Sequence, residues 1–276
     1  MPALSPLGRL YLLLVAGLVV GPFAPLAIQS VAFRWAWPDL LPADWWWERR
    51  DASPLPLAWD YVLSPYSRLG EAMLNTVGIG LAAALLSLLV GLPAARVLAR
   101  RRGRGRGALD AALALPLVVP EAAVGLALLM VFIQAGLAGG YAGIVLAHLI
   151  PTLPYTVRML AAVWQGIGPE HEEQAATLGA TRAQTFRLVT LPMLLPGVAA
   201  GCLFAFLVSS NVFLLTFLLG QGRVVTLPTL LFSKLSGGQL DASAAGIALV
   251  STLPGLALLV VADRMIREDA LGRGLG

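Results

Sequence analysis

The amino-acid sequence predicts an all-α, polytopic membrane protein with about six transmembrane helices. Of its 276 residues, 58% are apolar and only 12% are charged. A soluble domain of this size would have too few polar side chains to cover its surface. In addition, six apolar stretches are each long enough to cross a hydrocarbon core of about 30 Å. Together these observations exclude an ordinary soluble domain.

The predicted spans follow one another along the whole chain. The first has no obvious small-residue cleavage site in its polar flank, so we interpret it as a retained helix and not as a removed signal peptide. The sequence then divides into an N-terminal helix with an extracytoplasmic loop (1–68), a core of five helices (69–265) and a cytoplasmic tail (266–276). The six stretches are 10–33, 69–99, 109–134, 139–165, 193–220 and 242–265.

Arginine residues gather in four segments that all fall on the same side of the membrane if there are six spans, which orients the chain. Short loops rich in arginine stay in the cytoplasm, so we expect both termini and the link 168–192 to be cytoplasmic. The arginine–glycine tract 102–107 could resemble an RNA-binding segment, but its position between two spans favours topology control and contact with anionic lipid, with no nucleic-acid partner. The arginines are Arg9, Arg96, Arg100, Arg101, Arg102, Arg104, Arg106, Arg182, Arg187, Arg264, Arg267 and Arg273.

The link 34–68, on the opposite side, is rich in tryptophan. Its rings could form a docking surface for an external partner. They could equally form an interfacial aromatic belt at the depth of the lipid headgroups, which is a common use of tryptophan in membrane proteins. The residues concerned are Trp35, Trp37, Trp45, Trp46, Trp47 and Trp59.

The polar link 168–192 predicts two short helices joined at a glycine. Pro169 suits the first position of a helix, and the glutamates that follow place negative charge at the positive end of its dipole. Gly179 suits the left-handed residue after the helix, and Thr181 with Gln184 forms a capping box that begins a second helix. Pro192 biases the preceding residue away from helical geometry, so we expect the second helix to end there.

The same segment carries a resemblance to a known family. The spacing E-x-A-x-x-x-G, then nine residues, then [IV]-x-L-P resembles the EAA loop of binding-protein-dependent ABC importer permeases, and we call residues 168–192 the EAA loop. Gln174 departs from the family pattern, which usually has Ala there. Asn75 and Thr76 resemble the pair that opens the permease core. The residues that the resemblance assigns to coupling with an ATPase are Glu173, Gln174, Ala175, Gly179, Val189, Leu191 and Pro192.

The resemblance implies a permease subunit in the bacterial cytoplasmic (inner) membrane that works by alternating access. Its implied partners are a cytoplasmic ABC ATPase dimer, a second permease that is either another copy or a different chain, an extracytoplasmic solute-binding protein, and membrane lipid. The chain itself lacks the phosphate-binding motif G-x-x-x-x-G-K-[ST], H-E-x-x-H and G-x-S-x-G. We therefore expect no enzyme activity and no cofactor in this chain, with ATP and magnesium bound by the partner ATPase.

Polar residues inside the predicted spans mark a candidate substrate path. Glu121 follows Pro120 in the third span and could line a path for cations, or it could be a structural residue hydrogen-bonded to a neighbouring helix. Ser210 and Asn211 in the fifth span could face the path or simply join helices. His148 is interpreted as an interhelical hydrogen-bonding residue and not as a metal ligand, because no second ligand stands at a suitable spacing.

The substrate class follows from the branch of the family that the chain resembles most, which transports polyamines, phosphonates or ferric ion. The acidic residue after Pro120 is similar to that of polyamine permeases, so spermidine or putrescine is the expected solute. Phosphonate, ferric ion or another small solute is the alternative. An anionic solute would be repelled by Glu121 unless Arg158 or Arg223 compensated. From other classes, a stand-alone ion-coupled carrier or channel and a membrane scaffold remain open.

Overall fold

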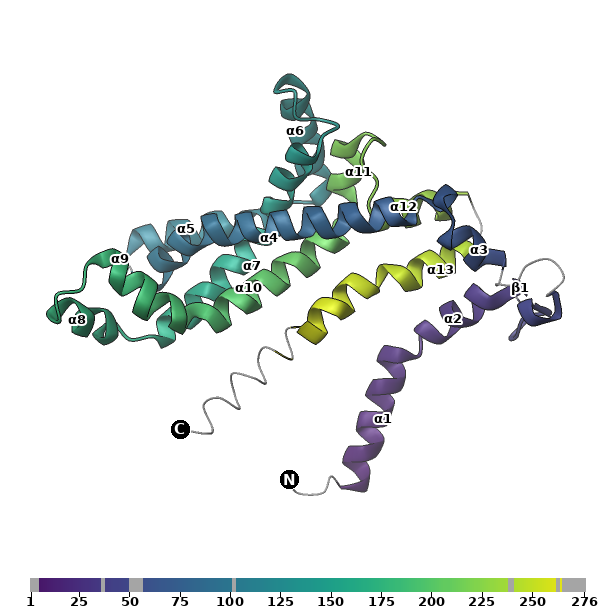
Figure 1. Ribbon diagram of the computed structural model, residues 1–276, viewed down its shortest axis with the longest axis horizontal. Helices are drawn as coiled ribbons and strands as arrows, with labels where there is room; N and C mark the ends of the chain where they lie inside the picture. The colour runs from purple at the N-terminus through teal and green to yellow at the C-terminus, as the bar shows by residue number, and fades with distance from the viewer. Residues whose placement is uncertain are drawn as a thin grey trace. The chain divides into compact units, whose positions relative to one another are not determined.

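The computed structural model describes residues 5–35, 38–49, 57–100, 103–237, 241–261 and 264. Figure 1 shows that helices make up nearly all of its regular structure, which confirms the all-α prediction. Two short strands, β1 (Ala32–Arg34) and β2 (Asp44–Trp45), pair antiparallel. The α-helices are α1 (Pro6–Val20), α2 (Phe23–Val31), α3 (Leu57–Leu63), α4 (Leu69–Arg100), α5 (Arg104–Val118), α6 (Glu121–Gln134), α7 (Tyr141–Gly166), α8 (Glu170–Thr177), α9 (Arg182–Thr185), α10 (Leu191–Asn211), α11 (Leu214–Gly220), α12 (Leu227–Leu235) and α13 (Ala242–Ser251).

Shorter helical turns connect some of these helices. The 3-10 helices η1 (Trp46–Arg49) and η2 (Pro65–Ser67) lie in the link after α2, and the π-helical segment η3 (Phe186–Thr190) precedes α10. Part of the sequence analysis concerns residues outside the described part of the chain. These are Trp37, Arg101, Arg102, Met265, Arg267, Arg273 and the tail 266–276.

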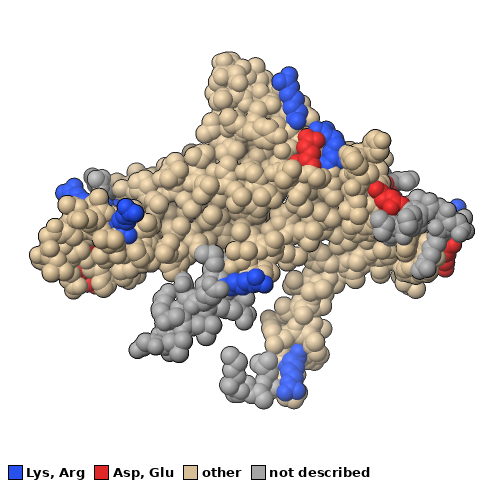
Figure 2. All heavy atoms as spheres, in the orientation of Figure 1, with Lys and Arg blue, Asp and Glu red and all other residues tan. Residues whose placement is uncertain are grey.

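Apolar side chains lie on the exposed outer faces of the helices as well as in the contacts between helices. Leu85 and Leu89 of α4 are 57% and 68% exposed, and Met130 of α6 is 69% exposed. Figure 2 shows that uncharged residues make up most of the visible face. Such a surface would be unfavourable in water, whereas lipid tails are as apolar as leucine. The outer faces of these helices are therefore suited to a bilayer.

The prediction of about six spans agrees with the helices observed. Single helices long and apolar enough to cross a membrane number four in the described chain, and two pairs of helices bent at a short break raise the number to six if each pair is one span. The single helices are Leu69–Arg100, Tyr141–Gly166, Arg182–Asn211 and Ala242–Val261. The bent pairs are Pro6–Val20 with Phe23–Val31 and Gly105–Val118 with Glu121–Gln134.

The predicted third span is interrupted near its middle and consists of two helices. Its two halves, α5 and α6, meet at an angle of 99°. Val119 leaves helical geometry, with φ −75° and ψ 132°. The cause is Pro120, because a proline ring disfavours helical geometry in the residue before it and offers no N–H to the helix. The break places Glu121 at the first position of a new helix.

The predicted fifth span, 193–220, is wrong at both ends. The helix begins at Arg182 and ends at Asn211, and α11 follows as a separate helix. Val212 has ψ 110°, so the chain is extended at the break. Asn211 donates a side-chain hydrogen bond to the carbonyl of Leu207 at 2.8 Å. Serine and asparagine compete in this way with helical hydrogen bonds, which favours a helix end at this position.

The chain forms two compact units, and the first consists of Met1–Ala72 and Leu230–Leu253. Within it, α2 and α3 pack against α13. The rings of Trp45 and Trp47 stack with their centroids 4.4 Å apart. Lys234 donates to the hydroxyl of Tyr61 at 2.5 Å.

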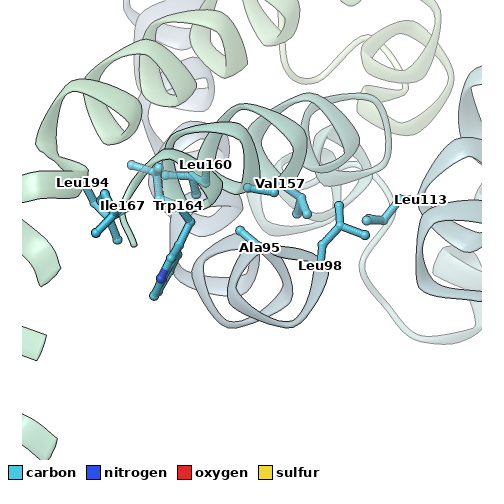
Figure 3. Packing of buried hydrophobic residues seen from close by; sticks show 10 residues of the cluster. Ala95, Leu98, Leu113, Val157, Leu160, Trp164, Ile167 and Leu194 are labelled. Atoms are coloured by element: carbon cyan, nitrogen blue, oxygen red, sulfur yellow. The ribbon is translucent and has the colours of Figure 1, made fainter. Parts of the chain in front are cut away.

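The second unit consists of Met73–Thr229 and Pro254–Gly276, and it is built around α7 packed along α10. In Figure 1, α8 and α9 lie at one end of the helices α4, α7 and α10. Figure 3 shows the apolar core near that end, where Trp164 is only 2% exposed. Its other labelled members are Ala95, Leu98, Leu113, Val157, Leu160, Ile167 and Leu194. Because Ile167 directly precedes the EAA loop, this core fixes the position of the loop.

Candidate functional site

The first helix of the EAA loop ends where predicted and starts one residue later than predicted. α8 starts at Glu170, one residue after the predicted start, with Pro169 as its N-cap. Gly179 has φ +82°, the left-handed conformation that favours glycine. The N–H of Ala180 bonds to the carbonyl of Ala175, and the N–H of Gly179 bonds to that of Ala176, both at 3.0 Å. These two bonds form a Schellman motif, so the predicted role of Gly179 as the helix stop is confirmed.

The second helix begins as predicted and does not end as predicted. Thr181 and Gln184 form the reciprocal capping box, which confirms the expected start. However, α9, η3 and α10 run as one helix from Arg182 to Asn211, so the expected stop before Pro192 is wrong. The N–H of Leu191 bonds to the carbonyl of Phe186, five residues earlier, which widens the helix just before the proline ring. A wider turn accommodates a ring that would clash in a regular α-helix.

Apolar side chains of the EAA loop are exposed, although the loop lies outside the apolar stretches. Leu178 is 89% exposed and Leu188 is 70% exposed. Glu173 and Gln174 are also exposed, whereas Ala175 turns inward and is 9% exposed. Large exposed apolar side chains in a polar segment are typical of a surface that binds another protein.

A carboxylate joins α8, the first helix of the EAA loop, to α4 and to η3. Glu172 Oε2 lies 3.1 Å from Arg96 Nη2, and its Oε1 lies 3.7 Å from Arg100 Nη2. Thr190 donates to Glu172 Oε1 at 3.3 Å. The guanidinium carbon of Arg96 also lies 5.9 Å from the ring centroid of Trp164. The sequence analysis treated Glu172 only as a charge in the first turn of α8, because no sequence motif indicates which way its side chain points.

The break in the third span forms one wall of a hollow of about 650 Å³. Two of the three predicted path residues, Glu121 and Asn211, line it together with side chains of α7 and α10. Glu121 is the only charged side chain among the described residues that line this hollow. Glu121 Oε1 accepts a hydrogen bond of 3.4 Å from the N–H of Leu215. That N–H belongs to the first turn of α11, where backbone donors lack helical partners.

The third predicted path residue, Ser210, does not line the hollow. Its Oγ is buried and has no hydrogen-bond partner among the described residues. Arg158, one of the two arginines that could offset Glu121, instead lies 3.1 Å from Asp110. Neither Arg158 nor Arg223 is among the residues that line the hollow.

His148 joins three helices next to this hollow, which confirms its interpretation as an interhelical hydrogen-bonding residue. Its Nδ1 lies 2.7 Å from Ser209 Oγ of α10, and its Nε2 lies 2.9 Å from Thr216 Oγ1 of α11. Thr216 donates its own proton to the carbonyl of Val212 at 3.3 Å, so it accepts from Nε2–H. In a neutral imidazole with Nε2 protonated, Nδ1 accepts the proton of Ser209. His148 thus holds α10 and α11 together across the break at Val212.

Asn75 and Thr76 fix the start of α12. Asn75 Nδ2 donates to the carbonyl of Val225 at 2.8 Å, and Thr76 Oγ1 accepts from the N–H of Leu227 at 2.8 Å. Tyr141 donates to Asn75 Oδ1 at 2.9 Å. These residues were noted in the sequence only for their resemblance to a family pair, and their hydrogen-bonding role could not be predicted because their partners lie about 150 residues away.

Comparison with known families decides the identity. Residues 72–267 match the family described as binding-protein-dependent transport system inner membrane component. This chain belongs to that family. The permease is thus a membrane-embedded transport subunit, as its EAA loop and apolar helices indicated. The fold agrees, because the permease superposes with a TM-score of 0.71 on a bacterial ABC transporter involved in the import of alginate, at 17% identity, covering 96% of this chain and 99% of that one.

Several relatives of the permease are named for the transport of molybdenum, of sulfate, or of molybdate and tungstate. The permease is 34% identical over 233 residues to the molybdenum transport system permease protein ModB of Mycobacterium bovis, covering 79% of this chain and 80% of that one. It is 35% identical to the sulfate transport system permease protein CysT of Salmonella typhimurium, covering 54% and 57%. It is also 35% identical to the molybdate/tungstate permease WtpB of Pyrococcus abyssi, covering 49% and 54%. These relatives do not support the expected polyamine solute.

Proposed function

We propose that the permease is the membrane subunit of an ATP-driven importer for a tetrahedral oxyanion of the molybdate, tungstate and sulfate class. The observation that carries this proposal is the 34% identity to a molybdenum transport permease over most of both chains. Molybdenum, tungsten and sulfur reach cells in water as doubly charged tetrahedral anions of similar size. An extracytoplasmic binding protein would select among them and deliver the anion, and the permease would provide the route across the membrane.

In this proposal Glu121 has a structural role. A carboxylate on the wall of a path would repel an oxyanion, and none of the described residues lining the hollow carries a positive charge to offset it. The hydrogen bond from the N–H of Leu215 gives Glu121 a different task, which is to join the start of α6 to the first turn of α11. Asn211 lines the same hollow and is uncharged.

The EAA loop would dock in a groove of a separate ATPase. The support is its Schellman turn, its capping box and the exposure of Leu178 and Leu188, which would be buried in the complex. A second permease, either another copy or a different chain, would complete the assembly in the inner membrane, with both termini on the cytoplasmic side. The residues proposed for this docking are Glu173, Gln174, Ala175, Gly179, Val189, Leu191 and Pro192.

The proposal is tested by two measurements, one on the cognate binding protein and one on the assembled importer. First, calorimetry of the cognate binding protein with molybdate, sulfate and spermidine identifies the solute, and we expect binding of an oxyanion and none of spermidine. Second, Glu121→Gln keeps the side-chain shape and an oxygen that can accept from Leu215. We therefore expect oxyanion uptake within about twofold of the wild type, since Glu121 is exposed and substitution of an exposed side chain usually changes stability little. Binding of spermidine together with loss of uptake in E121Q would replace the oxyanion proposal by the polyamine interpretation.

A further inference from the structure

One carboxylate in the EAA loop points away from the surface proposed for the ATPase. α8 carries three glutamates in its first turn, and Glu170 and Glu173 are exposed. The side chain of Glu172 is only 20% exposed. It lies three residues before the buried Ala175, so both occupy the same inward face of the helix.

Three elements of the second unit meet at Glu172. They are the last turns of α4, through Arg96 and Arg100, the first turn of α8 itself, and the end of η3 through Thr190. Thr190 is 1% exposed and the side chain of Arg96 is 56% exposed, so this contact runs from the packed interior to the surface of the unit. A displacement of α8 therefore acts on the end of a membrane-spanning helix through one side chain.

The two guanidinium groups offer Glu172 adjacent positions. Arg96 and Arg100 are four residues apart on one helix, which places them on the same face and about 6 Å apart along its axis. Arg96 is at hydrogen-bond distance from Glu172, at 3.1 Å. Arg100 Nη2 is buried, lies 3.7 Å from Glu172 Oε1 and has no hydrogen-bond partner among the described residues. A buried donor without a partner is costly, so a short movement of Glu172 toward Arg100 would be favourable.

We propose that Glu172 is the positioning residue that transmits movement of the EAA loop to α4, with Arg96 and Arg100 as alternative partners one helical turn apart. When the ATPase displaces α8, the carboxylate exchanges one guanidinium for the other and remains paired throughout. An unpaired carboxylate in this half-buried place would be unfavourable, so Glu172 stays bound to one arginine or the other. Because both arginines belong to α4, this helix then moves together with α8. This inference rests on the proposed function, because it requires an ATPase docked on the EAA loop.

The test is the number of ATP molecules hydrolysed per molybdate ion transported, measured on the wild-type importer and on Glu172→Gln in liposomes. Glutamine keeps the shape of the side chain and removes its charge. We expect this number to rise about tenfold, the factor that corresponds to losing a charge-assisted hydrogen bond. The amount of ATPase that copurifies with the permease should remain at the wild-type level, which a merely structural role would not predict.

The matched control is Glu170→Gln, which removes the same charge from the same turn at an exposed position. It should leave the ATP cost of transport unchanged. Arg96→Gln and Arg100→Gln should each raise the cost in part, and combining both with E172Q should add nothing beyond E172Q alone, because the three side chains act as one unit.

Several results would overturn the inference. These are an ATP cost in E172Q equal to that of the wild type, an equal rise in E170Q, or additive effects of the arginine and Glu172 substitutions. Loss of ATPase copurification in E172Q would show a structural role and overturn it as well. A wild-type importer without ATP-dependent uptake would overturn the proposed function and this inference together, whereas a coupled wild type with an unchanged E172Q would overturn the inference alone.

Discussion

Replacement of Gly179 by valine should weaken the binding of the ATPase without affecting membrane insertion. Gly179 has φ +82°, and a Cβ at this position would meet no atom within 4 Å apart from its own neighbours. A side chain here therefore causes no clash, and its cost comes only from the backbone conformation. For a residue with a Cβ that cost is about 1–2 kcal/mol, and a β-branched residue is at the upper end.

This cost acts on the population of the docking conformation. If the turn at Gly179 is adopted less often, the apparent dissociation constant for the ATPase rises by the same factor, which is about tenfold for 1.4 kcal/mol. The assay is titration of the purified ATPase onto detergent-solubilised permease, with binding measured by light scattering or surface plasmon resonance. The wild type, Gly179→Asn, Gly179→Ala and Gly179→Val are compared.

The series separates conformation from size. Asparagine tolerates the left-handed region far better than alanine or valine, although it is larger than alanine. We therefore expect affinities in the order glycine, asparagine, alanine, valine. Equal affinities throughout would refute the role of the Schellman turn in docking, and an order that follows side-chain size would indicate a steric contact with the ATPase instead.

Two further predictions concern the packing of the second unit. Gly197→Leu would place a Cβ 2.8 Å from Val163 Cγ2 between α10 and α7, so overpacking should lower stability by about 1–3 kcal/mol; a thermal midpoint in detergent as high as that of the wild type would contradict this close packing. His148→Phe removes the hydrogen bonds to Ser209 and Thr216 and places their hydroxyls against an apolar ring, so we expect stability to fall by about 2–4 kcal/mol. His148→Gln should restore part of this stability, because its amide can bond to the hydroxyls. Unchanged melting of H148F would show that the α10–α11 break is held by other contacts.

Local sequence signals predicted the parts of the fold that depend on neighbouring residues. Gly179 and the pair Thr181 and Gln184 form hydrogen bonds with residues at most five positions away, and their roles could be predicted from spacing alone. The apolar stretches were also recognisable, because crossing a bilayer requires length and hydrophobicity regardless of packing.

Prolines were harder to interpret because the same ring can break a helix or be accommodated within it. Pro120 breaks the third span by 99°, whereas Pro192 lies within a continuous helix after a π-helical turn. The outcome depends on whether the preceding carbonyls find other donors, which is set by tertiary packing.

The functional contacts of Glu172 and Glu121 could not be predicted from the sequence. Their partners lie 76 and 94 residues away, and no local pattern indicates which of several glutamates faces them. The sequence analysis therefore assigned coupling to motif residues that include Glu173, and it left Glu121 open between a cation path and a structural role. The contacts favour Glu172 as the link to α4, and they favour a structural role for Glu121.

The most direct test of the account is uptake of radiolabelled molybdate into liposomes that contain the purified permease assembly. We predict uptake only when ATP, the ATPase and the loaded binding protein are all present, with the EAA loop on the side of the membrane that binds the ATPase. Uptake driven by an ion gradient through the permease alone would contradict the account, because it would show transport without the force that the EAA loop is proposed to receive.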